Sequence, residues 1–239
     1  MGGMKFSAFR RYAGLFGAAG LLLTVCGCEA VVGSTSQTLV RVIDASANAG
    51  GVDVYAGSTA IDNNVGDGTI TNYAFLAPGP TTLAVHPAGK STVSEKVSGS
   101  LLASQQYSVY LTDSGTGYGA TLLADQNVPA PAGYVNVRFL DQAPVTGPVD
   151  VYFIPDGTKL TTAKPVLTAF QPGGISSYLS IPAGTWDLVV EPTGVTALTS
   201  AYVSAPTVYS GGQVRTMLII DQSLASAPPV NVIVGNDVN

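Results

Sequence analysis

Histidine and cysteine are almost absent from this sequence, which has one histidine and two cysteines among 239 residues. With His86 alone, a zinc site of three histidine ligands is excluded. A site that mixes cysteine and histidine is excluded as well if Cys28 is modified as argued below. We therefore expect no metal and no cofactor, and general-base catalysis by a histidine could rest only on His86.

Charged residues are also scarce, at 10% of the chain, and the 15 acidic residues outnumber the 10 basic ones. A surface with this acidic balance repels phosphate backbones, so we expect no nucleic-acid partner. Low charge would suit a disordered chain, but a hydrophobic content of 46% does not. The chain is therefore expected to fold around apolar cores.

Glutamate occurs only three times, as Glu29, Glu95 and Glu191. None of the three lies in a context that suggests the paired carboxylates of a glycosidase. The sequence also lacks the G-x-S-x-G motif, a phosphate-binding glycine loop and a dinucleotide fingerprint. We predict that the protein is not an enzyme, with no catalytic residue to name. The alternative is a cell-envelope hydrolase that acts on glycans through a carboxylate site that the sequence does not reveal.

Helical periodicity is missing after the first 25 residues. Apolar runs are short and are interrupted by turn residues, and the chain contains 28 glycines and 15 prolines. Many short strands separated by such turns are typical of an all-β protein.

The N-terminus has the pattern of an export signal. Lys5, Arg10 and Arg11 form a basic head, and residues 12–25 form an uncharged apolar core. This core is shorter than the roughly 20 residues that a helix needs to span a membrane. We therefore interpret it as a signal peptide and exclude it from the fold.

The signal ends in the letters VCGC, which resemble the lipobox of bacterial lipoproteins. Cys28 fits best as the lipidated residue, because the small residue Gly27 precedes the cut. Lipidation of Cys26, ordinary cleavage after Ala30 and a disulfide between the two cysteines are the alternatives. Lipidation of Cys28 predicts a lipoprotein of the cell envelope, held at a membrane by its N-terminus. In a Gram-negative host this would be the outer membrane or a periplasm-facing membrane.

One phrase of the sequence occurs twice. The letters VRVIDASANAGGVDVY (40–55) align without gaps on VRFLDQAPVTGPVDVY (137–152), with eight of sixteen positions identical. A second block, residues 73–89, aligns on 178–194, and the second copy carries extra residues between its two blocks. Each copy has seven or eight short expected strands, which predicts a β-sandwich.

This duplication predicts two tandem β-sandwich domains, immunoglobulin-like or transthyretin-like, after the signal segment. The expected organisation is a signal peptide (1–27), a flexible tether (28–37), a first repeat (38–126), a linker (127–133) and a second repeat (134–239). Within the repeated phrase, strand alternation places Arg41 opposite Val40 and Val42. We expect Arg41 to pair with Asp53, and Arg138 with Asp150, as cross-strand ion pairs that fix the register of the strands. A charged ligand site formed by these residues is the alternative.

The repeated phrase, followed by a strand of the type PAGTWDLVV, resembles the domain-of-unknown-function family 4397. The resemblance covers most of residues 38–235 and implies a β-sandwich fold, export and attachment at the cell surface. It implies no activity, because the family has no established one. The sequence departs from the family's usual HASP letters, since Asp44 and Asp141 stand where the family has a histidine.

Two further motifs could form functional sites. His86 ends an expected strand where the second copy has Glu191, and two different polar residues at one position favour an exposed rim over a catalytic site. The segment DNNVGDG, from Asp62 to Asp67, has calcium-loop composition but fails the EF-hand spacing. A plain turn is the simpler interpretation, with a weak calcium site as the alternative.

The chain contains eleven tyrosines and one tryptophan, which could contact a glycan or a protein. Tyrosines that occur in both copies, such as Tyr55 and Tyr152, are expected to be structural. The candidates for exposed ligand contact are Tyr107, Tyr110, Tyr118, Tyr202 and Tyr209. The predicted function is a cell-envelope lipoprotein that acts as a non-catalytic binding, adhesion or structural module, with an envelope glycan or protein as its partner.

Overall fold

The computed structural model describes residues 36–155, 158, 160–195, 202–222 and 230–238. The chain divides into residues 1–34 and a compact unit over residues 35–239, which contains all the described residues. Apart from one short 3₁₀ turn, the regular elements of this described part are β-strands, so the expectation of an all-β fold is confirmed. No helix among the described residues is long and apolar enough to cross a membrane.

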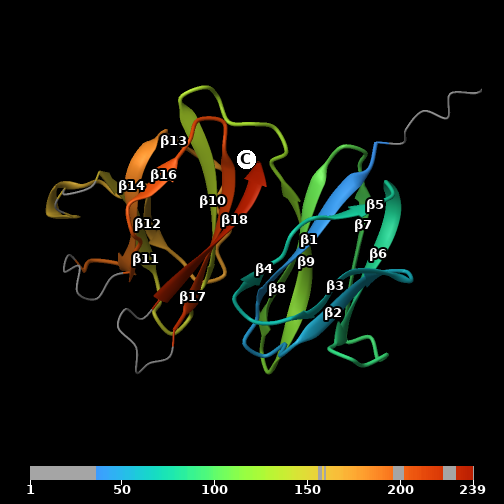
Figure 1. Ribbon diagram of the computed structural model, residues 1–239. Helices are drawn as coiled ribbons and strands as arrows, with labels where there is room; N and C mark the ends of the chain where they lie inside the picture. Colours follow the sequence, from blue (N-terminus) through green and yellow to red (C-terminus); the bar gives the residue numbers. More distant parts are fainter. Residues whose placement is uncertain (1–35, 156–157, 159, 196–201, 223–229, 239) are drawn as a thin grey trace, which may run out of the picture. The chain divides into compact units, whose positions relative to one another are not determined.

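The first repeat contains two β-sheets (Figure 1). Its strands are β1 (Thr38–Ala45), β2 (Val52–Ala56), β3 (Thr59–Val65), β4 (Thr69–Ile70), β5 (Ala74–Leu76), β6 (Gly79–Pro87), β7 (Glu95–Leu101), β8 (Gln106–Ser114) and β9 (Gly117–Asp125). One sheet, here called the β1 sheet, has the order β4-β1-β8-β9, and β5 also pairs with β1. The other, the β2 sheet, has the order β3-β2-β6-β7.

The second repeat has the same plan. Its elements are β10 (Tyr134–Gln142), β11 (Val149–Pro155), the 3₁₀ turn η1 (Leu160–Thr162), β12 (Leu167–Phe170), β13 (Leu179–Pro182), β14 (Gly184–Pro192), β15 (Tyr202–Val203), β16 (Thr207–Tyr209), β17 (Val214–Asp221) and β18 (Val230–Val238). The β10 sheet has the order β13-β10-β17-β18, and the β11 sheet has the order β12-β11-β14-β15 with β16 on β14. In both repeats the first strand pairs in parallel with a strand near the end of the copy, β1 with β8 and β10 with β17.

Strand alternation explains the apolar cores. In β1, Val40 and Val42 point into the core between the β1 and β2 sheets, and Val52 and Val54 of β2 meet them there. A corresponding core forms between the β10 and β11 sheets around residues such as Phe139. Burying these valine and phenylalanine side chains stabilises each sandwich by roughly 1.5–3 kcal/mol per side chain.

A third apolar cluster joins the two repeats. It contains Ile43 and Tyr110 from the β1 sheet together with Leu140 and Leu218 from the β10 sheet. The β1 strand is therefore buried on both faces, with valines toward its own core and Arg41, Ile43 and Ala45 on the opposite face. The two repeats are in direct contact through these two sheets.

The expected ion pairs between Arg41 and Asp53, and between Arg138 and Asp150, are wrong. Arg41 lies on β1 and Asp53 on β2, which belong to different sheets, so their side chains face opposite sides of the sandwich. Arg41 instead forms a 2.6 Å ion pair with Asp237 of the second repeat. Arg138 forms one of the same length with Asp125 of the first repeat.

Candidate functional site

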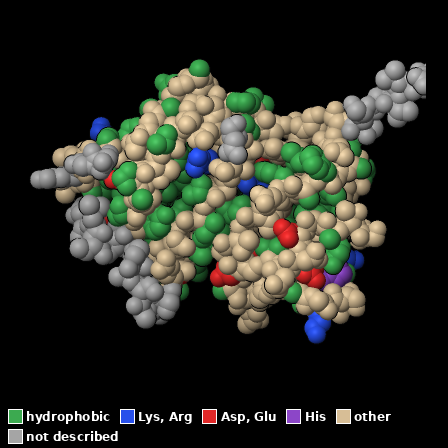
Figure 2. Space-filling model, in the orientation of Figure 1, with side chains coloured by type: hydrophobic (Ala, Val, Ile, Leu, Met, Phe, Trp, Pro, Cys, Tyr) green, Lys and Arg blue, Asp and Glu red, His purple; other side chains and the backbone are tan. Residues whose placement is uncertain are grey.

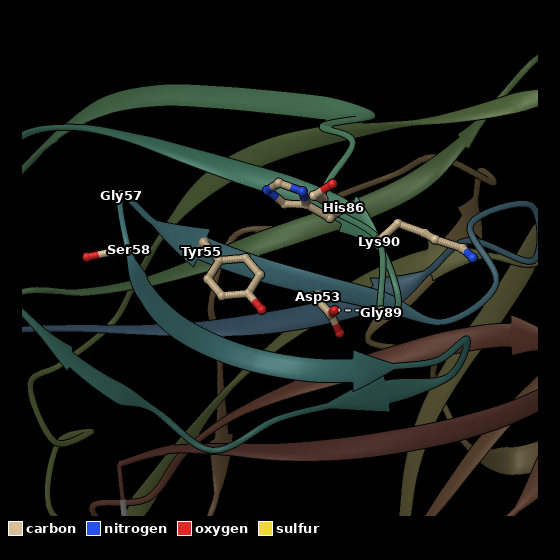
Figure 3. Close-up of a pocket in the computed structure, with 8 residues that line it drawn as sticks. Asp53, Tyr55, Gly57, Ser58, His86, Gly89 and Lys90 are labelled. Atoms are coloured by element: carbon tan, nitrogen blue, oxygen red, sulfur yellow. Dashed lines mark hydrogen bonds between the residues drawn. The ribbon is translucent and has the colours of Figure 1, made fainter.

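The outer face of the β2 sheet carries an open pocket of about 450 Å³. Alternation on β2 places Val52 and Val54 in the core and turns Asp53 and Tyr55 outward. On the neighbouring strand β6, His86 lies directly opposite Asp53. The residues that line the pocket come from these two strands and from the turns that follow them: Asp53, Tyr55, Gly57, Ser58, His86, Gly89, Lys90 and Ser91 (Figure 3).

Asp53 is fixed at the base of this pocket. Its Oδ1 accepts a hydrogen bond of 2.8 Å from the backbone N–H of Asn64, and its Oδ2 accepts one of 2.8 Å from the N–H of Gly89. These two bonds to the charged form hold the pKa of Asp53 below its ordinary value. The pocket therefore contains a carboxylate that stays ionised and whose orientation is set before any ligand arrives.

Tyr55 and His86 form an aromatic pair beside this carboxylate. Their ring centroids are 5.3 Å apart, and the rings meet edge to face at 82°. The hydroxyl of Tyr55 donates to Oδ1 of Asn63 at 3.1 Å, which orients the phenol ring. Nδ1 of His86 is buried and has no hydrogen-bond partner. The imidazole ring nevertheless lines the pocket.

The pocket lacks the connections of a catalytic triad. Ser58, Ser91 and Lys90 line it, but no hydrogen bond within the described residues joins His86 to a serine or to Asp53. A nucleophile needs a base within hydrogen-bond reach and a group that orients this base. The described part of the chain also brings no three histidine, cysteine, aspartate or glutamate side chains together in a way that could hold a metal ion.

The corresponding face of the second repeat is covered. Its equivalent residues, Asp150, Tyr152 and Glu191, follow the same strand pairing. The extra residues of the second copy include Leu160 of η1, which packs with Tyr152 and Val189 in a small apolar cluster. The first repeat has no such insertion, so its pocket stays open.

The expectation that His86 and Glu191 mark an exposed rim is wrong for Glu191. This residue has no exposed surface, and neither carboxylate oxygen has a hydrogen-bond partner. Burial, together with the nearby charge of Asp150, raises the pKa of Glu191. His86 is half-buried at the pocket. The rim prediction failed because the burial of a strand end depends on what packs against it, which a difference between two residue types does not reveal.

Three of the five tyrosines predicted to be exposed are buried, so this prediction is wrong for them. Tyr107 packs in the core of the first repeat and accepts a hydrogen bond from the N–H of Leu102. Tyr110 belongs to the cluster between the repeats, and Tyr209 packs in the core of the second repeat. Each lies on a strand face that an opposing sheet covers.

Tyr118 and Tyr202 are half-buried, and their contact with a ligand stays a prediction. The hydroxyl of Tyr118 hydrogen-bonds that of Ser94. Tyr55 was missed because its repetition as Tyr152 suggested a purely structural role. The signal that could have identified it was its cross-strand neighbourhood: His86, the single histidine of the chain, is replaced in the second copy.

Two other predictions concern the segment with calcium-loop composition and the lipidation site. Asp62 lies on β3, where its carboxylate accepts a hydrogen bond from the N–H of Asn63. Asp67 lies in the exposed turn that follows, and no metal-binding group of three forms there within the described residues. Cys28, the predicted lipidation site, lies outside the described residues.

Comparison with known proteins gives one family and a distant structural likeness. Residues 38–152 match the family model described as "Domain of unknown function (DUF4397)", which confirms the resemblance read from the sequence over this range. No curated protein matches the chain. Among solved structures, the chain is similar to CBMbc, a family CBM26 module of Amy13K from Eubacterium rectale, solved in complex with maltoheptaose. The two share 9% identity, with 82% of this chain and 96% of that chain covered and a TM-score of 0.26, a likeness too small to carry an argument about ligands.

Proposed function

Because residues 38–152 match the model of the family DUF4397, whose description names no activity, we propose the function of this chain from its own site. We propose that it is a non-catalytic binding module of the cell envelope. The module is anchored through a lipid on Cys28 and binds a hydroxyl-rich ligand, an envelope glycan, in the pocket of Asp53, Tyr55 and His86.

The observation that carries this proposal is the combination of an aromatic pair with a pre-oriented carboxylate in an open pocket. Sugars present C–H groups that pack on aromatic rings, and hydroxyls that need acceptors. Each oxygen of Asp53 already holds one N–H and has a second lone pair to offer. Pockets that combine a few fixed polar groups with apolar surface are typical ligand sites.

The pKa values of the carboxyl groups support a hydrolase less well than a binding module. A glycosidase needs one carboxylic acid with a raised pKa next to one ionised carboxylate, both within reach of the substrate. The carboxyl groups with a raised pKa include Asp44, Asp141 and Glu191, and these three have no exposed surface. Asp53, which does reach the pocket, has a lowered pKa and suits binding rather than proton donation.

A panel of envelope glycans tests both hypotheses together. We expect retention on the immobilised protein with no release of product. Tyr55→Ala and His86→Ala should each weaken binding of the retained glycan by about tenfold or more, a loss of roughly 1.4 kcal/mol. Tyr134→Ala is the matched control, because Tyr134 is an exposed tyrosine of the second repeat.

Two results would count against the binding module. Product formation that a single Asp or Glu substitution abolishes would establish the hydrolase instead. Retention that is unchanged in both pocket variants would place the ligand elsewhere on the protein.

The anchor is tested separately by partitioning between detergent and water. Acyl chains contribute about 0.8 kcal/mol per buried methylene, so two or three chains on one cysteine hold a protein stably at a membrane. We expect the wild type to enter the detergent phase and Cys28→Ala to stay in the aqueous phase, with Cys26→Ala as the control. Equal aqueous partitioning of all three would contradict the anchor.

A further inference from the structure

The two repeats meet through surfaces that carry the same polar residue types at matching positions. We call this contact the joining face. Each repeat contributes one arginine, one tyrosine, one hydroxyl residue and one aspartate. The first repeat supplies Arg41, Tyr73, Ser108 and Asp125, and the second supplies Arg138, Tyr178, Thr216 and Asp237.

The ion pairs of the joining face cross from one repeat to the other in both directions. Nη2 of Arg41 lies 2.6 Å from Oδ1 of Asp237, and Nη2 of Arg138 lies 2.6 Å from Oδ1 of Asp125. The hydroxyl of Thr216 also accepts from both arginines, at 3.2 Å and 3.0 Å. All four charged side chains are at most 4% exposed, and their charges cancel within the set.

Each repeat orients its own half of the set. In the first repeat, the hydroxyls of Tyr73 and Ser108 donate to Oδ2 of Asp125 at 2.8 Å and 2.6 Å. The guanidinium of Arg41 lies over the ring of Tyr73, 4.7 Å from its centroid. Asp125 therefore has two hydroxyl donors from within its own repeat, in addition to the arginine from the other.

The second repeat reproduces this arrangement. The hydroxyls of Tyr178 and Thr216 donate to Oδ2 of Asp237 at 2.6 Å and 2.8 Å. The guanidinium of Arg138 lies 4.9 Å from the centroid of the Tyr178 ring. The tyrosines, hydroxyl residues and aspartates thus make the same contacts on both sides of the joining face. The arginine contacts differ, since Nε of Arg41 donates to Ser108 and Nε of Arg138 has no partner.

Apolar residues surround this polar set and also match between the repeats. Ile43 follows Arg41 by two positions, as Leu140 follows Arg138, and Tyr110 and Leu218 stand two positions after Ser108 and Thr216. A contact in which the same patch occurs on both partners is the isologous type found in two-fold symmetric dimers. We infer that the joining face recognises a repeat of its own kind, so that its partner outside the chain is a second copy of this chain, which pairs by exchanging repeats.

The linker sets the concentration at which this exchange competes with pairing inside one chain. Asp125 ends β9 and Tyr134 begins β10, so a short stretch joins the repeats. Short linkers give an effective concentration in the millimolar range, and hydrogen bonds from the N–H groups of Gln126 and Ala130 also hold this one against the second repeat. Pairing between chains should then be negligible at micromolar protein and substantial near 1 mM.

Refolding the full chain from urea at two protein concentrations tests the inference. After refolding at roughly 1 mM, we expect tens of per cent of the protein in a closed dimer of twice the monomer mass by light scattering. At roughly 1 μM the dimer should fall to about 1% or less. The double variant Arg41→Gln with Arg138→Gln should form no dimer at either concentration, and Lys96→Ala, an exposed change on β7, should behave as the wild type. Absence of a dimer in the wild type at 1 mM, or an undiminished dimer in the double variant, would overturn the inference.

Discussion

Replacing Asp237 by alanine is expected to lower the free energy of unfolding by about 3–5 kcal/mol, because removing one partner leaves a buried charge without compensation. Arg41, which is 1% exposed, would lose its closest counter-ion. The hydroxyls of Tyr178 and Thr216 would lose their acceptor in the same step. Urea unfolding followed by circular dichroism measures the change.

The destabilisation by Asp237→Ala should affect both repeats. Asp237 lies near the C-terminus, whereas the arginine that it neutralises lies on the first strand of the first repeat. We therefore expect both repeats to unfold together in the wild type. Asp125→Ala should cost about as much, because Asp125 plays the same role for Arg138. Asp62→Ala, a change outside the joining face, should stay within about 0.5 kcal/mol of the wild type. A loss below 1 kcal/mol in Asp237→Ala would contradict this account of the joining face.

Replacing Asp44 by asparagine is expected to stabilise the protein at pH 8 by up to about 4 kcal/mol and to leave it unchanged near pH 4. Asp44 has no exposed surface, and burial raises its pKa to about 7. Its Oδ1 accepts a hydrogen bond from the N–H of Ser46, which an asparagine side chain can also accept, while Oδ2 has no partner. The wild type therefore holds a buried carboxylate at pH 8 that the variant lacks.

Proton linkage determines the direction in which stability changes with pH. The folded protein keeps a proton on Asp44 up to about pH 7, whereas the unfolded chain loses it near pH 4. The contribution of this group is therefore fully present at low pH and is lost as the pH rises from about 4 to about 7. Thermal unfolding from pH 4 to pH 8 should show this decline in the wild type and a flatter profile in Asp44→Asn.

Asp141 occupies the same position in the second repeat, where burial raises its pKa to about 6. Asp141→Asn should give a smaller gain in the same direction, and Asp62→Asn, a change on β3, serves as the control. A loss of stability at pH 8 in both buried variants would show that these aspartates make ionised contacts that the structure does not contain.

The sequence predicted the class of fold and the duplication because both depend on local patterns. Short apolar runs between turn residues identify strands, and the repeated letters GVDVY mark the outward and inward positions of β2 and β11. Alternation also placed Arg41 on the face opposite Val40 and Val42. It could not show what covers that face. Whether Arg41 meets a strand of its own sheet or a second sandwich depends on contacts nearly 200 residues apart in the chain.

The candidate site could be predicted only in part. The sequence singled out His86 and noted that Glu191 replaces it, but it treated Tyr55 as structural because Tyr152 repeats it. Identical residues have different surroundings here, since Leu160 of the second copy packs on Tyr152 while Tyr55 lines an open pocket. The exposure of the tyrosines could not be predicted for a related reason. A sheet that is covered on both faces buries the side chains that point to either face. Charged side chains are sparse on the visible surface, as the composition implied (Figure 2).

The most direct test of the proposed binding function uses the single histidine of the chain. One imidazole gives one set of side-chain signals in a ¹H–¹³C spectrum, so His86 reports on the pocket without assignment of other residues. When the glycan retained in the panel is titrated into the protein, these signals should shift and saturate together with the bound fraction. The sugar signals should show no product after prolonged incubation. Saturating binding that leaves the His86 signals in place, or the growth of product signals, would contradict the account.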